Sequence, residues 1–192
     1  LTWNDPNCFG YCHSENGAQM RRGLTDFGRE AIQYMTDLGM LIDVSHLSDG
    51  GFYNVAEHAR DVGKPFVASH SNARAMSPHP RNMTDNMIRI LADKGGVMGL
   101  NYCPAFLDES GTGEESRIAD MVRHLTYIKN VGGSDVLAIG GDLDGIGGKL
   151  EIDSIDKTEL LFDALKSAGF TWAEIDGLAY KNAERVLRET LA

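Results

Sequence analysis

The chain is poor in cysteine and in positive charge. Its 192 residues include only three cysteines, Cys8, Cys12 and Cys103. A low and odd cysteine count argues against a disulfide scaffold and suits a reducing compartment. Lys and Arg together number 18 against 28 Asp and Glu, which gives a net charge of −10. This excess of negative charge disfavours nucleic acids and anionic membrane surfaces as partners, but it sets no limit on a small substrate.

Long hydrophobic runs are also missing. No stretch of about 18 apolar residues occurs, so we expect no membrane-spanning helix. No basic start followed by an apolar run is visible, so no signal peptide is expected, and together with the cysteine usage this predicts a cytoplasmic location. The first residue is Leu1 rather than Met. With 42% hydrophobic and 24% charged residues, residues 1–192 are expected to form one globular domain.

Short apolar runs alternate with amphipathic stretches along the chain. We expect strands at residues 1–4, 40–44, 66–69, 97–101 and 136–139. We expect helices at residues 26–38, 49–61, 84–93, 114–130, 156–168, from 172 onward and at 181–191. The helix at residues 26–38 places four apolar side chains on one face, which we expect to be buried: Phe27, Ala31, Met35 and Leu38. Such alternation predicts parallel strands joined by crossover helices, the α/β class.

Polar or aromatic side chains stand at the end of each predicted strand. They are Trp3 or Asn4, His46, His70, Asn101 or Tyr102, and Asp142. In a TIM barrel the C-terminal strand ends build the active site, whereas a doubly wound sheet concentrates function at one switch point. Side chains that can bind or react at successive strand ends favour a (β/α)8 barrel. The chain supplies only about five of the eight strands, and a full barrel takes about 250 residues.

The segment from residue 40 to residue 72 carries the strongest chemical signal. It predicts a strand, a helix and a second strand, and each strand ends in Ser-His, at His46 and at His70. Parallel strands joined by one helix bring these two histidines to the same edge of the sheet. Neutral imidazoles placed side by side are ordinary ligands of a transition metal. The alternative is a pair of structural histidines bonded to the backbone.

Two further residues are candidates for chemistry. Asp142 follows an apolar strand in the sequence GGDLDG, where a carboxylate can accept a proton from a metal-bound water. It can equally be a turn aspartate, since Asp and Gly favour turns. Arg81 can clamp a substrate carboxylate with two hydrogen bonds, although composition alone favours a solvated surface arginine.

The remaining histidines carry weaker signals. His58 and His124 fall within predicted helices, where we expect surface positions. His13 and His79 lie in predicted loops and are not expected to be ligands. Cys8, Cys12 and His13 have spacing too loose for a metal clip, and no second Cys/His pair completes one.

Seven segments together resemble the membrane dipeptidase (renal dipeptidase) family of zinc peptidases. They are LTWN, GLTDFGREAI, LGMLIDVSH, FVASHSNAR, HPRNMTD, GGVMGLNY and LAIGGDLDG, in the family's order and over nearly the whole chain. The resemblance implies a (β/α)8 barrel that holds two zinc ions bridged by a carboxylate. It also implies hydrolysis of dipeptides by metal-activated water, including dipeptides with a C-terminal D-residue.

The resemblance also assigns roles to individual residues. His46 and His70 correspond to the two histidines of the second zinc, Arg81 to the arginine that holds the substrate's carboxylate, and Asp142 to the catalytic and substrate-contacting aspartate. Trp3 stands where the family's first member has a substrate-contacting histidine. Its indole N–H can donate a hydrogen bond but cannot replace a ligand or base. With Tyr102 it completes the expected substrate contacts.

Two parts of the family's metal site have no counterpart here. The His-x-Asp of the first zinc and the bridging glutamate are absent from the sequence, and the chain resembles about strands 4–8 with the C-terminal helices. We therefore expect the chain alone to bind zinc poorly and to be inactive. Two alternatives remain open: another amidohydrolase-like deacylase, and a catalytically incomplete, non-catalytic module that folds as a homodimer.

Overall fold

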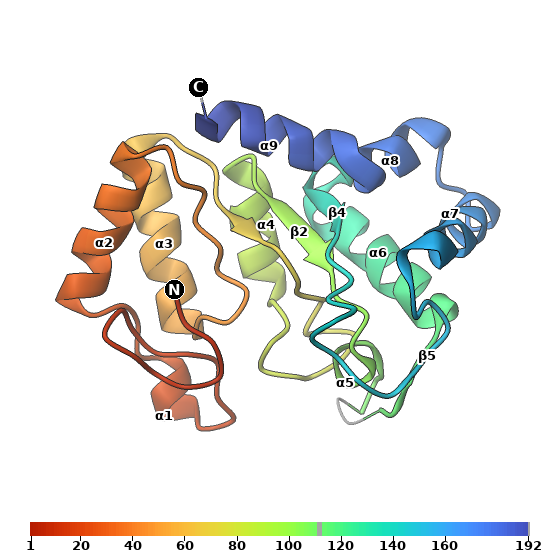
Figure 1. Ribbon diagram of the computed structural model, residues 1–192, viewed down its shortest axis with the longest axis horizontal. Coiled ribbons are helices and arrows are strands. Elements are labelled where there is room, and N and C mark those ends of the chain that lie inside the picture. The colour runs from red at the N-terminus through yellow and green to blue at the C-terminus, as the bar shows by residue number, and fades with distance from the viewer. Residues whose placement is uncertain (111–112, 192) are drawn as a thin grey trace.

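A parallel β-sheet lies at the centre of the chain, and helices cover it. The computed structural model describes residues 1–110 and 113–191. Its main sheet has three parallel strands in the order β1 (Val67–Ala68), β2 (Val97–Leu100) and β4 (Leu137–Ile139) (Figure 1). A second parallel pair joins β3 (Glu115–Ser116) to β5 (Lys149–Leu150). The predicted α/β class with parallel strands is confirmed.

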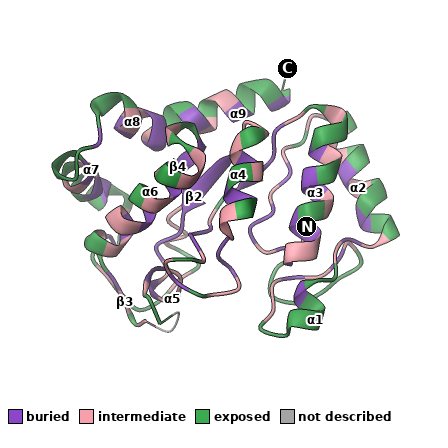
Figure 2. Cartoon of the chain, turned by 180° about the vertical axis from the view of Figure 1, so that it is seen from behind, coloured by how far each residue is buried: buried purple, intermediate pink, exposed green. Residues whose placement is uncertain are grey.

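Helices alternate with these strands along the chain. They are α1 (Gly17–Met20), α2 (Asp26–Asp37), α3 (Asp49–Val62), α4 (Asp85–Asp93), α5 (Pro104–Leu107), α6 (Ile118–Gly132), α7 (Thr158–Ser167), α8 (Trp172–Asp176) and α9 (Asn182–Leu191). A π-helical turn at Gly177–Lys181 joins α8 to α9. Both α4 and α6 turn a buried face inward and an exposed face outward (Figure 2). Within the described residues, no helix is long and apolar enough to cross a membrane.

Side-chain caps fix where several helices begin. Caps form on α2, α3 and α4, where a backbone N–H of the first turn donates to the side chain of Thr25, Ser48 or Thr84. At the start of α8, Thr171 and Glu174 cap each other reciprocally. Each cap satisfies an amide that has no partner inside the helix. The predicted starts of these four helices are confirmed.

The first two predicted strands are not regular strands. Residues 1–4 form no strand in the structure. Residues 40–44 run parallel to β1, but they make only one bridge, between Asp43 and Val67. The amide of Val44 donates to the carbonyl of Val67 at 2.9 Å, so this segment still extends the sheet by one position.

Two predicted helix starts are also wrong. The helix expected from residue 114 begins at Ile118, because Glu115–Ser116 pairs with β5 from a distant part of the chain. The helix expected from residue 156 begins at Thr158, after a 3-10 turn at Ile155–Lys157. In the first case a long-range strand pairing overrides the local preference.

The face that α2 turns inward matches the predicted one only in part. Ala31 and Met35 are half-buried, and Met35 packs against the core. Phe27 is 56% exposed and Leu38 is exposed as well, whereas Ile32 is buried. Gly28 sets this orientation, because a Cβ on it would lie 1.9 Å from the carbonyl oxygen of Phe9. This close backbone contact rotates the helix and leaves Phe27 to stack on Phe9, with ring centroids 5.4 Å apart.

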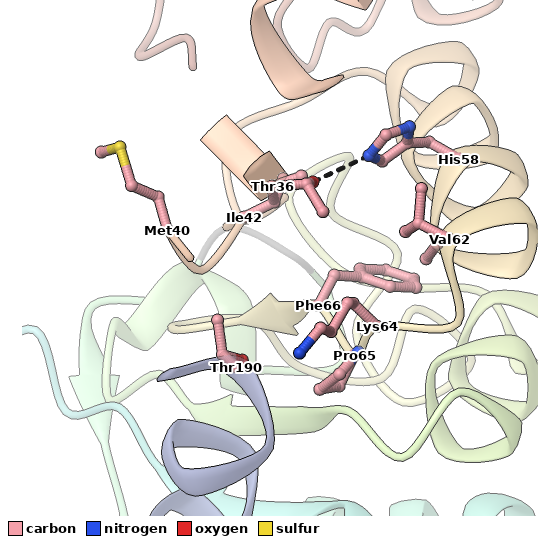
Figure 3. Close-up of a pocket in the computed structure, with 10 residues that line it drawn as sticks. Thr36, Met40, Ile42, His58, Val62, Lys64, Pro65, Phe66 and Thr190 are labelled. Atoms are coloured by element: carbon pink, nitrogen blue, oxygen red, sulfur yellow. Dashed lines mark hydrogen bonds between the residues drawn. The ribbon is translucent and has the colours of Figure 1, made fainter. Parts of the chain in front are cut away.

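Helix α9 covers the N-terminal ends of the central strands. The guanidinium of Arg185 donates to the carbonyl of Gly95, before β2, and to that of Asp135, before β4. Near the end of α9 a cavity of about 10 Å³ opens beside His58, whose Nε2 lies 2.8 Å from the hydroxyl of Thr36 (Figure 3). That volume accommodates about one water.

His124 is buried in α6 rather than exposed. Its side chain is 0% exposed, Nδ1 accepts a hydrogen bond from the amide of Ala73 at 3.2 Å, and Nε2 lies 3.1 Å from the carbonyl of Leu107. The ring therefore carries its proton on Nε2 and joins the loop after β1 to α5. Burial lowers the pKa of His124 to about 4, which keeps the ring neutral. The predicted surface position is wrong because both backbone partners come from distant parts of the chain, the loop after β1 and α5.

Replacing His124 by leucine is expected to lower the free energy of unfolding by about 2–4 kcal/mol, because a buried amide and a buried carbonyl lose their partners. His124→Gln keeps one donor and one acceptor and is expected to lose less. Urea denaturation measures both effects. An unfolding free energy of His124→Leu equal to that of the unsubstituted protein would contradict this role.

Candidate metal and substrate site

The candidate residues gather at the C-terminal edge of the sheet, opposite α9. His46 follows the bridge to β1, His70 follows β1, Asn101 follows β2 and Asp142 follows β4. In Figure 1 this edge is the lower one, where the connecting loops meet. Parallel strands place their C-terminal ends together, so residues far apart in the sequence become neighbours.

His46 and His70 face each other through their Nε2 atoms. These atoms lie 2.8 Å apart, and the ring centroids lie 4.9 Å apart. Burial and the nearby charge of Arg81 lower the pKa of His46 to about 3 and also lower the pKa of His70. Both rings are therefore neutral near pH 7, the form that binds a metal. The juxtaposition follows from the strand–helix–strand pattern.

Asp43 organises the serines beside the two histidines. Its Oδ1 accepts hydrogen bonds from the amide and hydroxyl of Ser45, at 3.0 and 2.8 Å, and from the amide of Ser69 at 2.9 Å. Its Oδ2 accepts one from the hydroxyl of Ser69 at 2.5 Å. Burial alone would raise the pKa of Asp43, but these bonds bring it below the usual value. This role was not predicted from the sequence, where the only signal is a carboxylate inside an apolar run.

His13 lies next to His46, although its sequence position gave no sign of this. The amide of His13 donates to the carbonyl of His46 at 3.0 Å, and the two ring centroids are 5.8 Å apart. Burial and Arg81 lower the pKa of His13 to about 4. Across the described residues, no three His, Cys, Asp or Glu side chains are arranged to hold a metal. His13 is thus a buried neighbour of the histidine pair.

Arg81 is a buried residue, so the interpretation from composition is wrong. Its side chain is 4% exposed, and Nη2 donates to the carbonyl of His70 at 3.2 Å. Nη1 is buried and has no hydrogen-bond partner in the described part of the chain. Burial lowers the pKa of Arg81 to about 10, against the opposing charges of Asp43 and Asp142. A buried cation with an unused donor is well suited to bind an anionic group.

Asp142 has an unusual backbone conformation and one fixed oxygen. Its φ is +59°, in the left-handed region that is costly for residues other than glycine and is often found at functional sites. The Nδ2 of Asn101 donates to its Oδ2 at 3.1 Å. The Oδ1 of Asn101 accepts from the amide of Cys103 at 2.6 Å, which fixes the orientation of that amide side chain. Oδ1 of Asp142 is left available, and a Cβ on Gly145 would lie 2.4 Å from it.

Comparison with known proteins identifies the family. A family model described as membrane dipeptidase (Peptidase family M19) matches residues 1–192. The chain belongs to this family. One relative is an uncharacterized protein of the pqqA 5′ region in Klebsiella pneumoniae. It is 37% identical to this chain, over 97% of this chain and 69% of that protein.

Two solved structures of metallopeptidases resemble this family member closely. Dipeptidase AC, a metallopeptidase of the same family, superposes with a TM-score of 0.89 at 30% identity. A metallopeptidase from Rhodobacter sphaeroides, bound to a phosphinate mimic of the dipeptide L-Ala-D-Ala, superposes with a TM-score of 0.88 at 30% identity. The chain is covered to 99% and 98%, but it spans only 55% and 54% of those proteins.

In this membrane dipeptidase family chain, the other two predicted substrate contacts differ in exposure. Trp3 is 68% exposed, and the neighbouring Thr2 donates to the carbonyl of His46 at 3.1 Å, so this segment lies beside the histidine pair. Tyr102 is fully buried, and burial raises its pKa to about 12, while the facing hydroxyl of Thr158 acts in the opposite direction. Its ring packs on Gly141, where a Cβ would lie 2.9 Å from Cε2.

The histidine pair fits part of a zinc site. Two neutral imidazoles present Nε2 atoms to a common position, and the buried Nδ1 of His46 has no partner among the described residues. Imidazole nitrogen is a preferred ligand of zinc. The donors on this chain can therefore supply two ligand positions of the metal that the family implies.

Proposed function

We propose that this chain carries part of the active site of a zinc-dependent dipeptidase, which hydrolyses dipeptides by metal-activated water and accepts a C-terminal D-residue. The observation that supports this most is the meeting of the His46–His70 pair, buried Arg81 and strained Asp142 at one edge of the sheet. The bound mimic of L-Ala-D-Ala in the Rhodobacter sphaeroides relative supports the tolerance for a D-residue.

We further propose that residues 1–192 belong to a single (β/α)8 barrel, of which they form about strands 4–8 and the C-terminal helices. The parallel order of the 40–44 segment, β1, β2 and β4 agrees with four neighbouring positions of such a barrel. Since the chain spans 54–55% of the two solved relatives, the barrel and the activity of the whole enzyme are proposals.

The residues of this chain would divide the work among them. Nη1 of Arg81 binds the substrate's C-terminal carboxylate, while Nη2 stays on the carbonyl of His70 and ties this contact to the histidine pair. Asn101 holds Oδ2 of Asp142 and leaves Oδ1 free to act. Oδ1 accepts a proton from the attacking water and delivers it to the leaving amine nitrogen. Zinc, when bound by His46 and His70, supplies a Lewis acid that polarises the peptide carbonyl and acidifies water.

His46 and His70 would form half of a two-zinc site. The family's His-x-Asp and bridging glutamate have no counterpart in these 192 residues, so we propose that the chain alone binds zinc weakly and is inactive. Trp3, which follows Thr2 beside the histidine pair, and Tyr102, at the end of β2, remain proposed substrate contacts. Trp3 is exposed, so its indole N–H is available to donate a hydrogen bond to a substrate.

Binding of a dipeptide mimic tests the substrate class without requiring turnover. The ligands are a phosphinate mimic of L-Ala-D-Ala and its C-terminal amide, titrated calorimetrically into the protein in the presence of zinc. We expect the amide to bind about 30-fold more weakly, because it loses a charge-assisted contact with Arg81. Equal binding of the two ligands would favour a deacylase that does not recognise a carboxylate, and absence of binding would contradict the proposal.

A further inference from the structure

A chain of hydrogen bonds connects the carboxylate of Asp43 to the ring of His70. The hydroxyl of Ser69 lies 2.5 Å from Oδ2 of Asp43 and 2.7 Å from Nδ1 of His70. The hydroxyl of Ser45 reinforces the arrangement, because it donates to Asp43 and accepts from the backbone amide of His70 at 3.0 Å. The nitrogen at the end of this chain is the one that does not face His46.

The direction of each hydrogen bond can be deduced from the groups involved. Oδ1 of Asp43 receives two backbone amides, from Ser45 and Ser69, which can only donate. An ionised carboxylate only accepts, so a separation of 2.5 Å between Oδ2 and the Ser69 oxygen requires the serine proton to lie between them. Because Ser69 has one proton, its oxygen must accept at the contact with His70, and the proton there belongs to Nδ1.

We propose that Asp43, acting through Ser69, is a positioning residue that holds the ring proton of His70 on Nδ1 and leaves the lone pair of Nε2 free for a metal. The metal side of this inference rests on the proposed function, whereas the position of the proton does not. Carboxylates that orient metal-binding histidines are a general device, and here a serine lies between the two groups.

His46 has no hydrogen bond at Nδ1 comparable to the one that Ser69 makes with His70 in the described residues. Its Nδ1 is buried without a partner in the described part of the chain. Since Nε2 of His70 carries no proton, the 2.8 Å contact between the two Nε2 atoms requires His46 to donate.

The variant Asp43→Asn reverses this chain of bonds. Three donors hold the amide oxygen at the place of Oδ1, so its NH₂ faces Ser69 and donates to it. The Ser69 proton then turns to Nδ1 of His70, and the ring proton moves to Nε2. Ser69→Ala removes the acceptor and leaves His70 a mixture of tautomers. Asp49→Asn is the matched control, because Asp49, the first residue of α3, pairs with Arg74 and contacts neither histidine.

Nitrogen NMR of histidine-labelled, metal-free protein reads the two ring nitrogens of each histidine directly. We expect the ring proton of His70 on Nδ1 in the unsubstituted protein and in the control Asp49→Asn. We expect it on Nε2 in Asp43→Asn, and exchanging between the two nitrogens in Ser69→Ala. A His70 protonated on Nε2 in the unsubstituted protein, or a tautomer that both variants leave unchanged, would overturn the proposal.

Zinc affinity, measured by competition with a chromogenic chelator, separates this proposal from the proposed function. We expect the dissociation constant to rise roughly tenfold to a hundredfold in Asp43→Asn and to stay unchanged in Asp49→Asn. If the tautomers change as expected but no variant binds zinc, the positioning role stands and the metal site fails. If zinc binds equally to all variants and the tautomer is unaffected, the metal site stands and the positioning role fails.

Discussion

Zinc affinity is expected to fall on the order of a hundredfold to a thousandfold when either His46 or His70 is replaced by alanine. Each substitution removes one of the two imidazole donors that this chain contributes, and the free energy of a zinc site is divided among a small number of ligands. The two Nε2 atoms already lie 2.8 Å apart, so each replacement removes one member of a preformed pair.

His58→Ala provides the control for this experiment. His58 is also a histidine with a lowered pKa, but it lies on α3 and bonds Thr36 beside the cavity at the other edge of the sheet. Its replacement is expected to leave the zinc dissociation constant unchanged in the same chelator competition. Zinc affinities of His46→Ala and His70→Ala that match the unsubstituted protein would show that the pair is structural.

Replacing Arg81 by methionine is expected to weaken binding of the phosphinate dipeptide mimic by at least about a hundredfold. The substitution removes the buried donor Nη1 and leaves the ligand's carboxylate without a charged partner. The same substitution is expected to change the free energy of unfolding by less than about 1 kcal/mol, because removing a desolvated cation offsets the lost bond to the carbonyl of His70.

Two further variants separate charge from geometry. Arg81→Lys keeps the charge but not the planar fork, and it is expected to recover only part of the affinity. Arg89→Met removes a charge on the exposed face of α4, near Asp85, and is expected to leave ligand binding unchanged. Calorimetric titration of each variant provides the affinities. Tight binding by Arg81→Met would contradict the assignment of the substrate's carboxylate to Arg81.

The sequence predicts those features of the structure that are determined by residues close together in the chain. Thr25, Ser48 and Thr84 cap the helices they precede, because a cap involves only a few neighbouring residues. The meeting of His46 and His70 is also predictable, since one strand–helix–strand unit determines it. The family resemblance then assigns Arg81 and Asp142 to the same site.

The parts that sequence does not predict depend on contacts between distant segments. His124 is buried because Ala73 and Leu107 offer it two backbone partners, and neither appears in the pattern of its helix. The inward face of α2 is set by Gly28 against the carbonyl of Phe9 rather than by the apolar residues of the helix. Asp43 interrupts an apolar run in the sequence, and its carboxylate accepts hydrogen bonds from Ser45 and Ser69, the residues that precede the two histidines.

An anomalous difference map, recorded at the zinc absorption edge from crystals of this protein soaked in zinc, would locate the metal directly. We expect a peak within bonding distance of Nε2 of both His46 and His70. Zinc bound elsewhere, with no peak between these two nitrogens, would contradict the assignment of the pair as metal ligands.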